Sequence, residues 1–204
     1  METLILASAS PRRKELLTHA GIPFEVQAAE VDEHCGCPAA EAVRILSSRK
    51  ARAVHARFPG RFILAADTLV ELDGQVLGKP SDPEDAAGML RRLSGRTHQV
   101  YTGVTVISPA GDVFTDCDRS DVTFGDVTGP EIAAYVQSGE PMDKAGAYAL
   151  QGRASLWVSR MEGSYSSVIG LPLFLVRALL LKAGYPLVDE SEDSLQITVK
   201  MPSP

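Results

Sequence analysis

The sequence predicts an α/β fold in which helices flank a mixed, twisted sheet, built as one unit that could divide into two lobes. Short apolar runs of strand length alternate with amphipathic stretches of helical length along the chain. Two pairs of strand-like segments are joined by short turns, which indicates antiparallel hairpins beside parallel strands. The 204 residues are 45% hydrophobic and 23% charged, a composition typical of a folded domain with one substantial core.

The N-terminal segment predicts a strand followed by a helix. Residues 4–7 form an apolar run of strand length. Ser10 is expected to be the N-cap of a helix that starts at Pro11 and ends near Ala20, because proline is tolerated in the first helical turn. The next expected elements are a strand at 24–28, an acidic loop at 30–33 and a long helix at 39–58.

The middle of the chain predicts a buried strand, a hairpin and a longer antiparallel pair. Residues 62–66 are the most strand-like run and lead into Asp67 and Thr68. Asp73-Gly74 is a strong hairpin signal between the strand-like residues on either side. The remaining expected elements are a helix from Asp82 to Gly95, strands at 100–107 and 113–122, a helix at 129–139, a glycine-rich segment at 144–152, strands around 155–158 and a helix at 171–182.

We expect residues 1–188 to form the domain and residues 189–204 to form a polar tail, either a flexible end or an edge strand at 195–199. The first residues lack the basic region of a signal peptide. The longest apolar stretch, 171–181, contains Arg177 and is too short to cross a bilayer. Three cysteines make a poor disulfide framework. These features favour a cytoplasmic protein with no membrane partner.

The charge balance bears on the class of ligand. The chain carries 26 acidic and 20 basic residues, a formal net charge of −6. A protein that coats nucleic acid must neutralise many backbone phosphates, so a nucleic-acid polymer is not an expected partner. One small phosphorylated ligand needs only a few local cations, and the charge balance does not exclude it.

Two arginines lie in the first turn of the first predicted helix. A helix N-terminus carries free N–H groups and the positive end of the helix dipole, so Arg12 and Arg13 are unfavourable there unless an anion lies between. The alternative is a pair of exposed arginines that contact an acid such as Glu15. The local pattern leaves both interpretations open.

Asp67 and Thr68 are expected at the carboxyl end of an apolar strand, where α/β sheets bind ligands. A carboxylate at that place suits a general base or a metal ligand. The simpler interpretation is a polar strand end that caps the following turn. Lys79 follows a glycine but does not belong to a phosphate-binding loop, because Pro80 stands where serine or threonine is required. Lys79 could therefore contact a phosphate or simply lie at the surface.

Glu33, Lys50 and Gln151 are ambiguous one by one. Glu33 and Lys50 are of types more often found at the surface than in a site. The small residues of the glycine-rich segment allow a close backbone approach, and Gln151 could read a nucleobase edge, although a packing role is equally consistent. Taken together, the cations, carboxylates, amide and helix N-terminus suit metal-assisted phosphoryl chemistry on a small polyphosphate.

The segment 6–17, Leu-Ala-Ser-Ala-Ser-Pro-Arg-Arg-Lys-Glu-Leu-Leu, resembles the signature of the Maf family of nucleotide pyrophosphatases, also called septum-formation-inhibitor-like proteins. The resemblance extends over residues 3–185. Further matches lie at 31–33, 50–51, 66–68, 78–80, 143–148, 151–152 and 163–172. The resemblance implies a fold related to the inosine-triphosphatase-like architecture, with a cleft between two lobes and often a homodimer.

The resemblance also implies an activity. It implies that the chain hydrolyses a nucleoside triphosphate to the monophosphate and pyrophosphate, with a divalent cation such as Mg²⁺ or Mn²⁺. In this scheme Asp67 is the general base that prepares water for attack on the α-phosphorus. The other roles that the resemblance implies are phosphate binding by Ser8, Arg13, Lys50 and Lys79, and metal binding by Glu33 with Asp67.

The resemblance further implies a substrate preference. Arg12, Thr68 and Gln151 match positions that mark the branch acting on dTTP and UTP. We therefore expect these substrates, together with modified pyrimidine nucleotides such as pseudo-UTP or 5-methyl-UTP. Two alternatives stay open: a 7-methyl-GTP pyrophosphatase of the same family, and a nucleotide-binding regulator of cell division with little catalysis.

Overall fold

The computed structural model describes residues 2–188, and the tail expected at 189–204 lies outside the described residues. The strands are β1 (Leu4–Leu6), β2 (Phe24–Val26), β3 (Ile63–Leu72), β4 (Gln75–Leu77), β5 (Thr97–Ile107), β6 (Val113–Phe124) and β7 (Val158–Glu162). The α-helices are α1 (Pro11–His19), α2 (Ala39–His55), α3 (Pro83–Leu93), α4 (Gly129–Gln137), α5 (Tyr165–Ile169) and α6 (Leu173–Lys182). Short 3₁₀ helices are η1 (Glu140–Asp143), η2 (Ala145–Ala147) and η3 (Arg153–Trp157).

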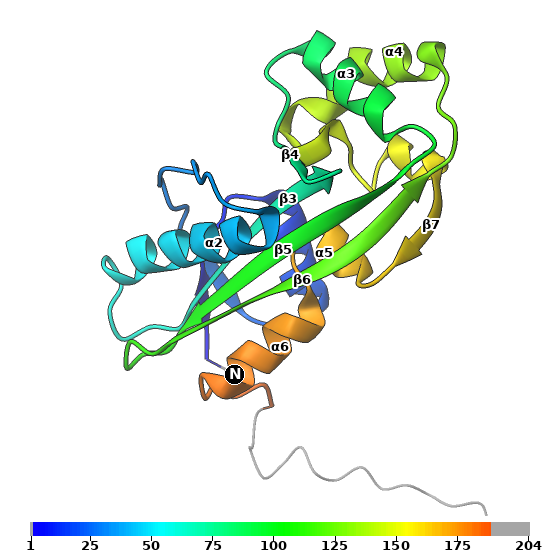
Figure 1. Ribbon diagram of the computed structural model, residues 1–204. Helices are drawn as coiled ribbons and strands as arrows, with labels where there is room; N and C mark the ends of the chain where they lie inside the picture. Colours follow the sequence, from blue (N-terminus) through cyan, green and yellow to red (C-terminus); the bar gives the residue numbers. More distant parts are fainter. Residues whose placement is uncertain (1, 189–204) are drawn as a thin grey trace, which may run out of the picture.

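The strands form one seven-stranded sheet in the order β2-β1-β3-β5-β6-β7, with β4 paired to β3. β1 pairs in parallel with β2 and β3, whereas β3, β5, β6 and β7 pair antiparallel. The long strands β3, β5 and β6 run through the whole molecule (Figure 1). The mixed α/β sheet expected from the sequence is therefore confirmed.

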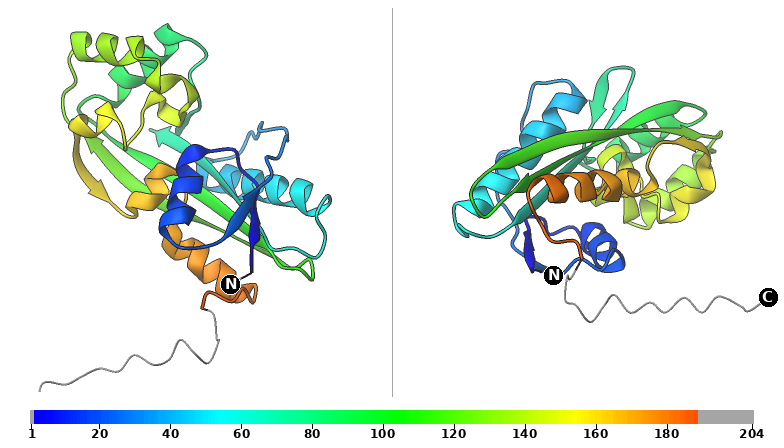
Figure 2. Two further views of the ribbon diagram at one scale, coloured as in Figure 1. Left: turned by 180° about the vertical axis from the view of Figure 1, so that it is seen from behind. Right: turned by 90° about the horizontal axis from the view of Figure 1, so that it is seen from below.

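Helices cover both faces of the sheet and form two lobes. In one lobe, α2 lies on one face, and α1 and α6 lie on the opposite face (Figure 2). The other lobe gathers β4, α3 and α4 at the far end of the long strands (Figure 1). Within the described residues, none of the helices has the length and apolar character needed to cross a membrane.

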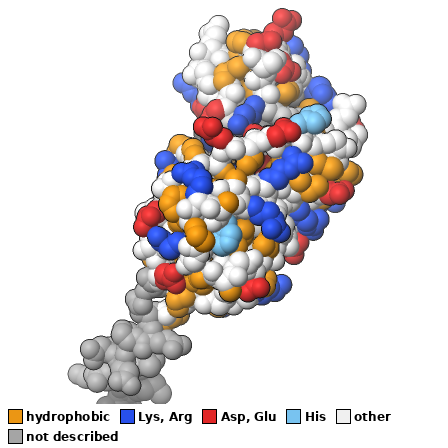
Figure 3. Space-filling model, turned by 90° about the vertical axis from the view of Figure 1, so that its left-hand side faces the viewer, with side chains coloured by type: hydrophobic (Ala, Val, Ile, Leu, Met, Phe, Trp, Pro, Cys, Tyr) orange, Lys and Arg blue, Asp and Glu red, His pale blue; other side chains and the backbone are white. Residues whose placement is uncertain are grey.

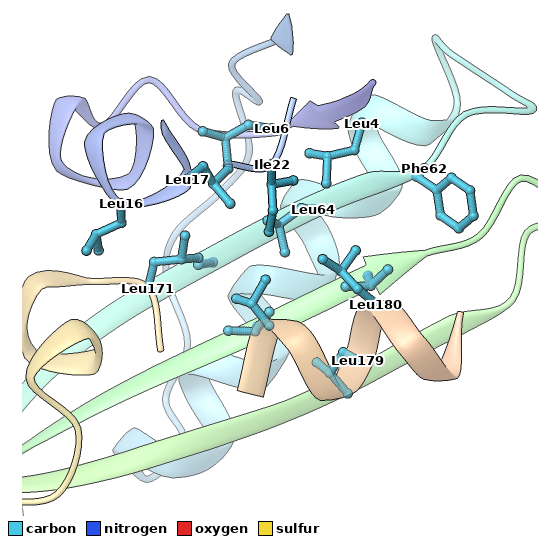
Figure 4. Packing of buried hydrophobic residues seen from close by; sticks show 14 of the residues in the cluster. Leu4, Leu6, Leu16, Leu17, Ile22, Phe62, Leu64, Leu171, Leu179 and Leu180 are labelled. Atoms are coloured by element: carbon cyan, nitrogen blue, oxygen red, sulfur yellow. The ribbon is translucent and has the colours of Figure 1, made fainter. Parts of the chain in front are cut away.

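The alternation of side chains along β3 divides the core of the first lobe into two layers. Ile63 and Ala65 point to the α2 face and join the cluster that contains Ala51 and Val54. Leu64 belongs to the opposite cluster with α1 and α6. Figure 4 shows residues of this second layer, among them Leu16, Leu17, Leu64, Leu179 and Leu180. The same alternation continues along the rest of β3, where it sets the face on which each later side chain lies.

The second lobe has its own core, in which aromatic side chains meet edge to face. The ring of Trp157 lies 5.0 Å from Tyr135 and 6.1 Å from Phe124, measured between ring centroids. Phe124 also contacts Tyr148 at 4.9 Å between ring centroids. This packing seats the glycine-rich segment between α4 and the end of β6.

Several local expectations are wrong. The strand expected around 155–158 is the 3₁₀ helix η3 followed by β7, because Trp157 turns inward to the aromatic cluster before the chain extends. The long helix ends at His55, and the last helix starts at Leu173, after Pro172. Ser10 stands at the N-cap position of α1 but makes no capping bond through its side chain.

Candidate active site

A cleft of about 630 Å³ lies between the two lobes. Its walls come from β1, α1, β3, the end of the β3–β4 hairpin, the glycine-rich segment and α5. On the face shown in Figure 3, basic and acidic side chains lie interspersed where the surface narrows between the lobes. All of the site residues expected from the sequence line this cleft: Ser8, Arg12, Arg13, Glu33, Lys50, Asp67, Thr68, Lys79 and Gln151.

Asp67 and Thr68 lie within β3, and the prediction that they follow the strand is wrong. β1 stops pairing with β3 at Leu64, while β3 continues to Leu72. Between Leu64 and Val70, where β4 begins to pair, this edge of β3 has no neighbouring strand, so side chains on both of its faces reach the cleft. By alternation Asp67 faces α2, and Thr68 faces α1 and α5.

Lys50 on α2 joins two carboxylates. Its Nζ lies 2.5 Å from Asp67 Oδ1 and 2.6 Å from Glu33 Oε1. Lys50 and Asp67 are almost fully buried, whereas Glu33 lies on an exposed loop. The hydrogen bond from Lys50 lowers the pKa of Glu33 below its usual value. The lysine thus holds two carboxylates together in the cleft and favours the ionised form of Glu33.

Gly103 makes the approach of α2 to the sheet possible. It is the cross-strand neighbour of Asp67 on β5. A Cβ at this position would lie 2.2 Å from the carbonyl oxygen of Val43 on α2. Only glycine lets the helix backbone pass so close to the sheet, and this close passage brings Lys50 to Asp67.

Arg13 is held by neutral oxygens on three sides. Its Nε donates to Gly170 O at 2.8 Å, Nη1 to Ser8 Oγ at 3.0 Å and Nη2 to Thr68 Oγ1 at 3.3 Å. Burial lowers the pKa of the guanidinium, which nevertheless stays charged. No carboxylate of the described residues forms an ion pair with Arg13. Its positive charge is therefore available to an anion in the cleft.

Arg12 connects the two lobes across the cleft. Its Nη1 lies 3.8 Å from Asp143 Oδ2 in η1. Because the Asp143 side chain is 67% exposed, the pair contributes little and can open. Lys79 and Gln151 are exposed on the opposite wall, at the hairpin end and in the glycine-rich segment. These three side chains are free to adapt to a ligand.

The backbone beside Gln151 is anchored to α4. Tyr135 Oη accepts a hydrogen bond of 3.1 Å from Ala149 N and donates one of 3.0 Å to Glu140 Oε1. A Cβ at residue 152 would lie 1.7 Å from the same carboxylate oxygen, so Gly152 lets Glu140 keep this contact with Tyr135. The segment that carries Gln151 is therefore preorganised on the second lobe.

The donor set can accommodate a divalent cation that shares its ligands with a phosphate. Glu33 and Asp67 already converge on one cationic atom, Lys50 Nζ. Carboxylate oxygens suit Mg²⁺ and Mn²⁺, and Mg²⁺ is commonly held by one or two carboxylates plus substrate phosphates. Among residues 2–188 no group of three or more His, Cys, Asp or Glu side chains could hold a metal alone. The remaining ligands would have to come from substrate and water.

Sequence reasoning missed Thr102, Gly103 and Tyr135. Thr102 occupies an inward position of β5 between Val100 and Val104, and all three side chains are at most 1% exposed. A polar residue in an otherwise apolar inward row is a signal that could have pointed to it. Gly103 and Tyr135 carry no such signal, because their roles depend on which helix crosses which strand.

Comparisons with known proteins identify the family of the chain. The family described as Maf-like protein matches residues 3–183. A dTTP/UTP pyrophosphatase of Symbiobacterium thermophilum is 49% identical over 92% of this chain and 97% of its own length. Proteins of the same name from Moorella thermoacetica and Myxococcus xanthus are 51% and 50% identical, over 88% and 90% of this chain and 94% of their own lengths.

A solved structure supports the fold. The Staphylococcus aureus Ham1 protein is 14% identical and superimposes with a TM-score of 0.54, over 89% of this chain and 99% of its own. At this identity the likeness concerns the architecture alone. The family match and the curated relatives, each covering most of the sequence, show that the chain belongs to the Maf family.

Proposed function

We propose that the chain is a nucleoside triphosphate pyrophosphatase that hydrolyses dTTP and UTP to the monophosphate and pyrophosphate. Relatives of about 50% identity carry the name dTTP/UTP pyrophosphatase. The observation that carries the proposal is the buried contact of Lys50 with Asp67, beside Arg13, in the cleft between the lobes. This arrangement combines a carboxylate that can accept a proton with cations that can bind a triphosphate.

The phosphates are bound at the α1 end of the cleft. Arg13 supplies a charged, oriented guanidinium, and Ser8 supports it. Lys79 reaches from the hairpin as a mobile point charge. Lys50, whose Nζ contacts Asp67 and Glu33, adds a third cation. Pyrophosphate leaves readily once its charge is neutralised, so catalysis depends mainly on positioning and electrostatics.

Asp67 serves as the general base. Lys50 holds its Oδ1 oxygen, and among the described residues none hydrogen-bonds Oδ2. This second oxygen is available to a water molecule, from which it accepts a proton as the water oxygen attacks the α-phosphorus. The oxygen–phosphorus bond that forms is in the monophosphate, and the bond that breaks releases pyrophosphate.

A divalent cation, Mg²⁺ or Mn²⁺, would be held by Glu33 and Asp67 together with phosphate oxygens. When bound, it neutralises the charge of the polyphosphate and lowers the cost of bringing it beside two carboxylates. Glu33 lies on a loop and is exposed, so it can move to share such an ion.

Selection of the pyrimidine base falls to the second lobe. Gln151 offers a paired donor and acceptor on a segment that Tyr135 holds in place. Arg12 gains freedom when its long contact with Asp143 opens. The relatives named dTTP/UTP pyrophosphatase support dTTP and UTP as substrates over 7-methyl-GTP, and modified pyrimidine nucleotides belong to the same proposal. The homodimer, the 1–188 domain boundary and the cytoplasmic location stay predictions.

A substrate panel tests the proposal. The protein is incubated with dTTP, UTP, CTP and 7-methyl-GTP in the presence of Mn²⁺, and pyrophosphate release is measured. We expect turnover of dTTP and UTP, reduced at least about 1,000-fold in Asp67→Asn. A preference for 7-methyl-GTP would favour the alternative pyrophosphatase. Triphosphate binding without hydrolysis would favour a regulatory protein instead.

A further inference from the structure

A line of hydrogen bonds runs from the cleft into the protein interior through two threonines. Arg13 Nη2 donates to Thr68 Oγ1 at 3.3 Å, and Thr68 Oγ1 lies 2.9 Å from Thr102 Oγ1. Thr102 donates in turn to the carbonyl oxygen of Ser167 on α5 at 2.9 Å. Thr68 and Thr102 are cross-strand neighbours on β3 and β5. The line therefore connects α1, two strands and α5.

The direction of each hydrogen bond follows from the number of hydrogens. A hydroxyl carries one hydrogen, and a carbonyl oxygen can only accept. Thr102 therefore donates its hydrogen to Ser167 O, and Thr68 must donate to Thr102. The Thr68 oxygen consequently turns its lone pairs toward Arg13 and the cleft, with no hydrogen left to offer there.

The line is shielded from water at its inner end. Thr102 and Ser167 are both 0% exposed, so water does not compete for their groups. A hydrogen bond in such surroundings is strong, and an unmade one is costly. The orientation of the Thr68 hydroxyl is thus set from inside the protein and not by the ligand.

We propose that Thr102 is a positioning residue that fixes Thr68 as an acceptor and thereby orients Arg13 toward the substrate phosphates. The inference rests on the proposed pyrophosphatase activity. In it, the Thr68 oxygen accepts a hydrogen bond from Arg13 and presents a lone pair, not a hydrogen, to the substrate. Without the Thr102 hydroxyl, the Thr68 hydroxyl can rotate so that its hydrogen points at the Arg13 N–H groups. The hydrogens on both sides carry partial positive charge and repel each other. Arg13 would then lose one of its three acceptors.

Three variants test the role of the hydroxyl. Thr102→Val keeps the shape and removes the hydroxyl, whereas Thr102→Ser retains it. Thr105→Val is a matched control, because Thr105 is equally buried on the same strand and its hydroxyl bonds Ser47 and Thr115 instead. We expect Thr102→Val and Thr105→Val to lower the melting temperature by similar amounts. Only Thr102→Val should alter phosphate binding.

The kinetic signature separates positioning from general destabilisation. In Thr102→Val we expect the KM for dTTP and the inhibition constant of inorganic tripolyphosphate to rise together by about 10-fold, with a smaller change in kcat. Thr102→Ser should restore both values to within about threefold of the unmodified chain. Unchanged constants in Thr102→Val, or an equal change in Thr105→Val, would overturn the inference.

A double-mutant cycle tests whether the effect passes through Arg13. If it does, Thr102→Val adds nothing to the loss of kcat/KM already caused by Arg13→Ala. Additive losses would show that Thr102 acts by another route and would overturn the proposal.

Calorimetric titration with inorganic tripolyphosphate distinguishes failure of the inference from failure of the proposed function. Binding that weakens about 10-fold in Thr102→Val supports the inference even if the chain hydrolyses no triphosphate. Normal hydrolysis of dTTP by the unmodified chain, with identical tripolyphosphate binding in Thr102→Val, contradicts the inference and leaves the proposed function intact.

Discussion

Lys50 and Asp67 form a buried hydrogen-bonded ion pair, with 2.5 Å between Nζ and Oδ1, although one residue lies on a helix and the other on a strand. The pair exists because α2 crosses β5 at Gly103, where its backbone can come close. Glu33 binds the same lysine from the outside of the cleft. The geometry of one crossing thus controls the charges that face the substrate.

Removal of Lys50 should strongly impair activity. In Lys50→Met, Glu33 and Asp67 would face each other without a cation, and we expect kcat/KM for dTTP to fall about 100-fold. Pyrophosphate release under steady-state conditions measures this loss. Lys182→Met removes an exposed lysine at the end of α6 and serves as the control. Comparable activity of Lys50→Met and the unmodified chain would rule out a role of this lysine in catalysis.

A methyl group at Gly103 should separate α2 from the sheet. Because a Cβ there would lie 2.2 Å from Val43 O, Gly103→Ala should lower the free energy of unfolding by about 2 kcal/mol or more and reduce activity with it. Gly88→Ala in α3 meets no atom within 4 Å and should instead raise stability by about 1 kcal/mol. Chemical denaturation of both variants tests the contrast, and equal stability would show that α2 can shift freely.

Stability should decrease with acidification because of a buried histidine. His98 is 0% exposed, and burial lowers its pKa from 6.5 to about 4. The unfolded chain therefore binds a proton that the native state does not, over the interval between these two values, and stability rises with pH there. From about pH 7.5 to about pH 5 we expect a loss of about 2 kcal/mol.

Two glutamine variants test this pH dependence. His98→Gln cannot titrate but can still hydrogen-bond Tyr148 Oη, which lies 2.9 Å from His98 Nε2. Between about pH 7.5 and about pH 5, the free energy of unfolding of His98→Gln should fall by about 2 kcal/mol less than that of the unmodified chain. His19→Gln replaces an exposed histidine and should leave the dependence as it is. An identical pH dependence in His98→Gln would show that the buried imidazole accepts its proton without unfolding.

Gln151 should affect the nucleoside and leave the phosphates alone. In Gln151→Ala we expect the KM for dTTP to rise about 10-fold, while inhibition by inorganic tripolyphosphate stays unchanged. Lys79→Ala serves as the contrast, since it should raise both the KM for dTTP and the inhibition constant of inorganic tripolyphosphate. If both constants rise in Gln151→Ala, this side chain contacts the phosphates and not the base.

The residue pattern predicted most elements because local signals were strong. The Asp73-Gly74 turn between β3 and β4 has positive φ at both residues, as its sequence suggests. Asp82 caps α3 through a bond from Asp85 N, as an aspartate before proline predicts. Helix α5 was missed because five residues carry too little periodicity, and its stop at Gly170 becomes visible only with the fold.

The residues that line the cleft could be predicted, whereas their geometry could not. The local pattern does not distinguish Arg12 from Arg13, yet Arg13 points inward to Ser8 and Thr68 while Arg12 reaches the other lobe. Asp67 and Thr68 are adjacent but face opposite sides of the sheet. That both reach one cleft depends on where β1 stops pairing, a property of the assembled sheet that no local pattern encodes.

Hydrolysis of dTTP in water labelled with a heavy oxygen isotope tests the central claim most directly. If water activated by Asp67 attacks the α-phosphorus, mass spectrometry will find the label in dTMP and none in pyrophosphate. The rate of labelled dTMP formation should fall at least about 1,000-fold in Asp67→Asn. Label in pyrophosphate, or an undiminished rate in Asp67→Asn, would contradict the account.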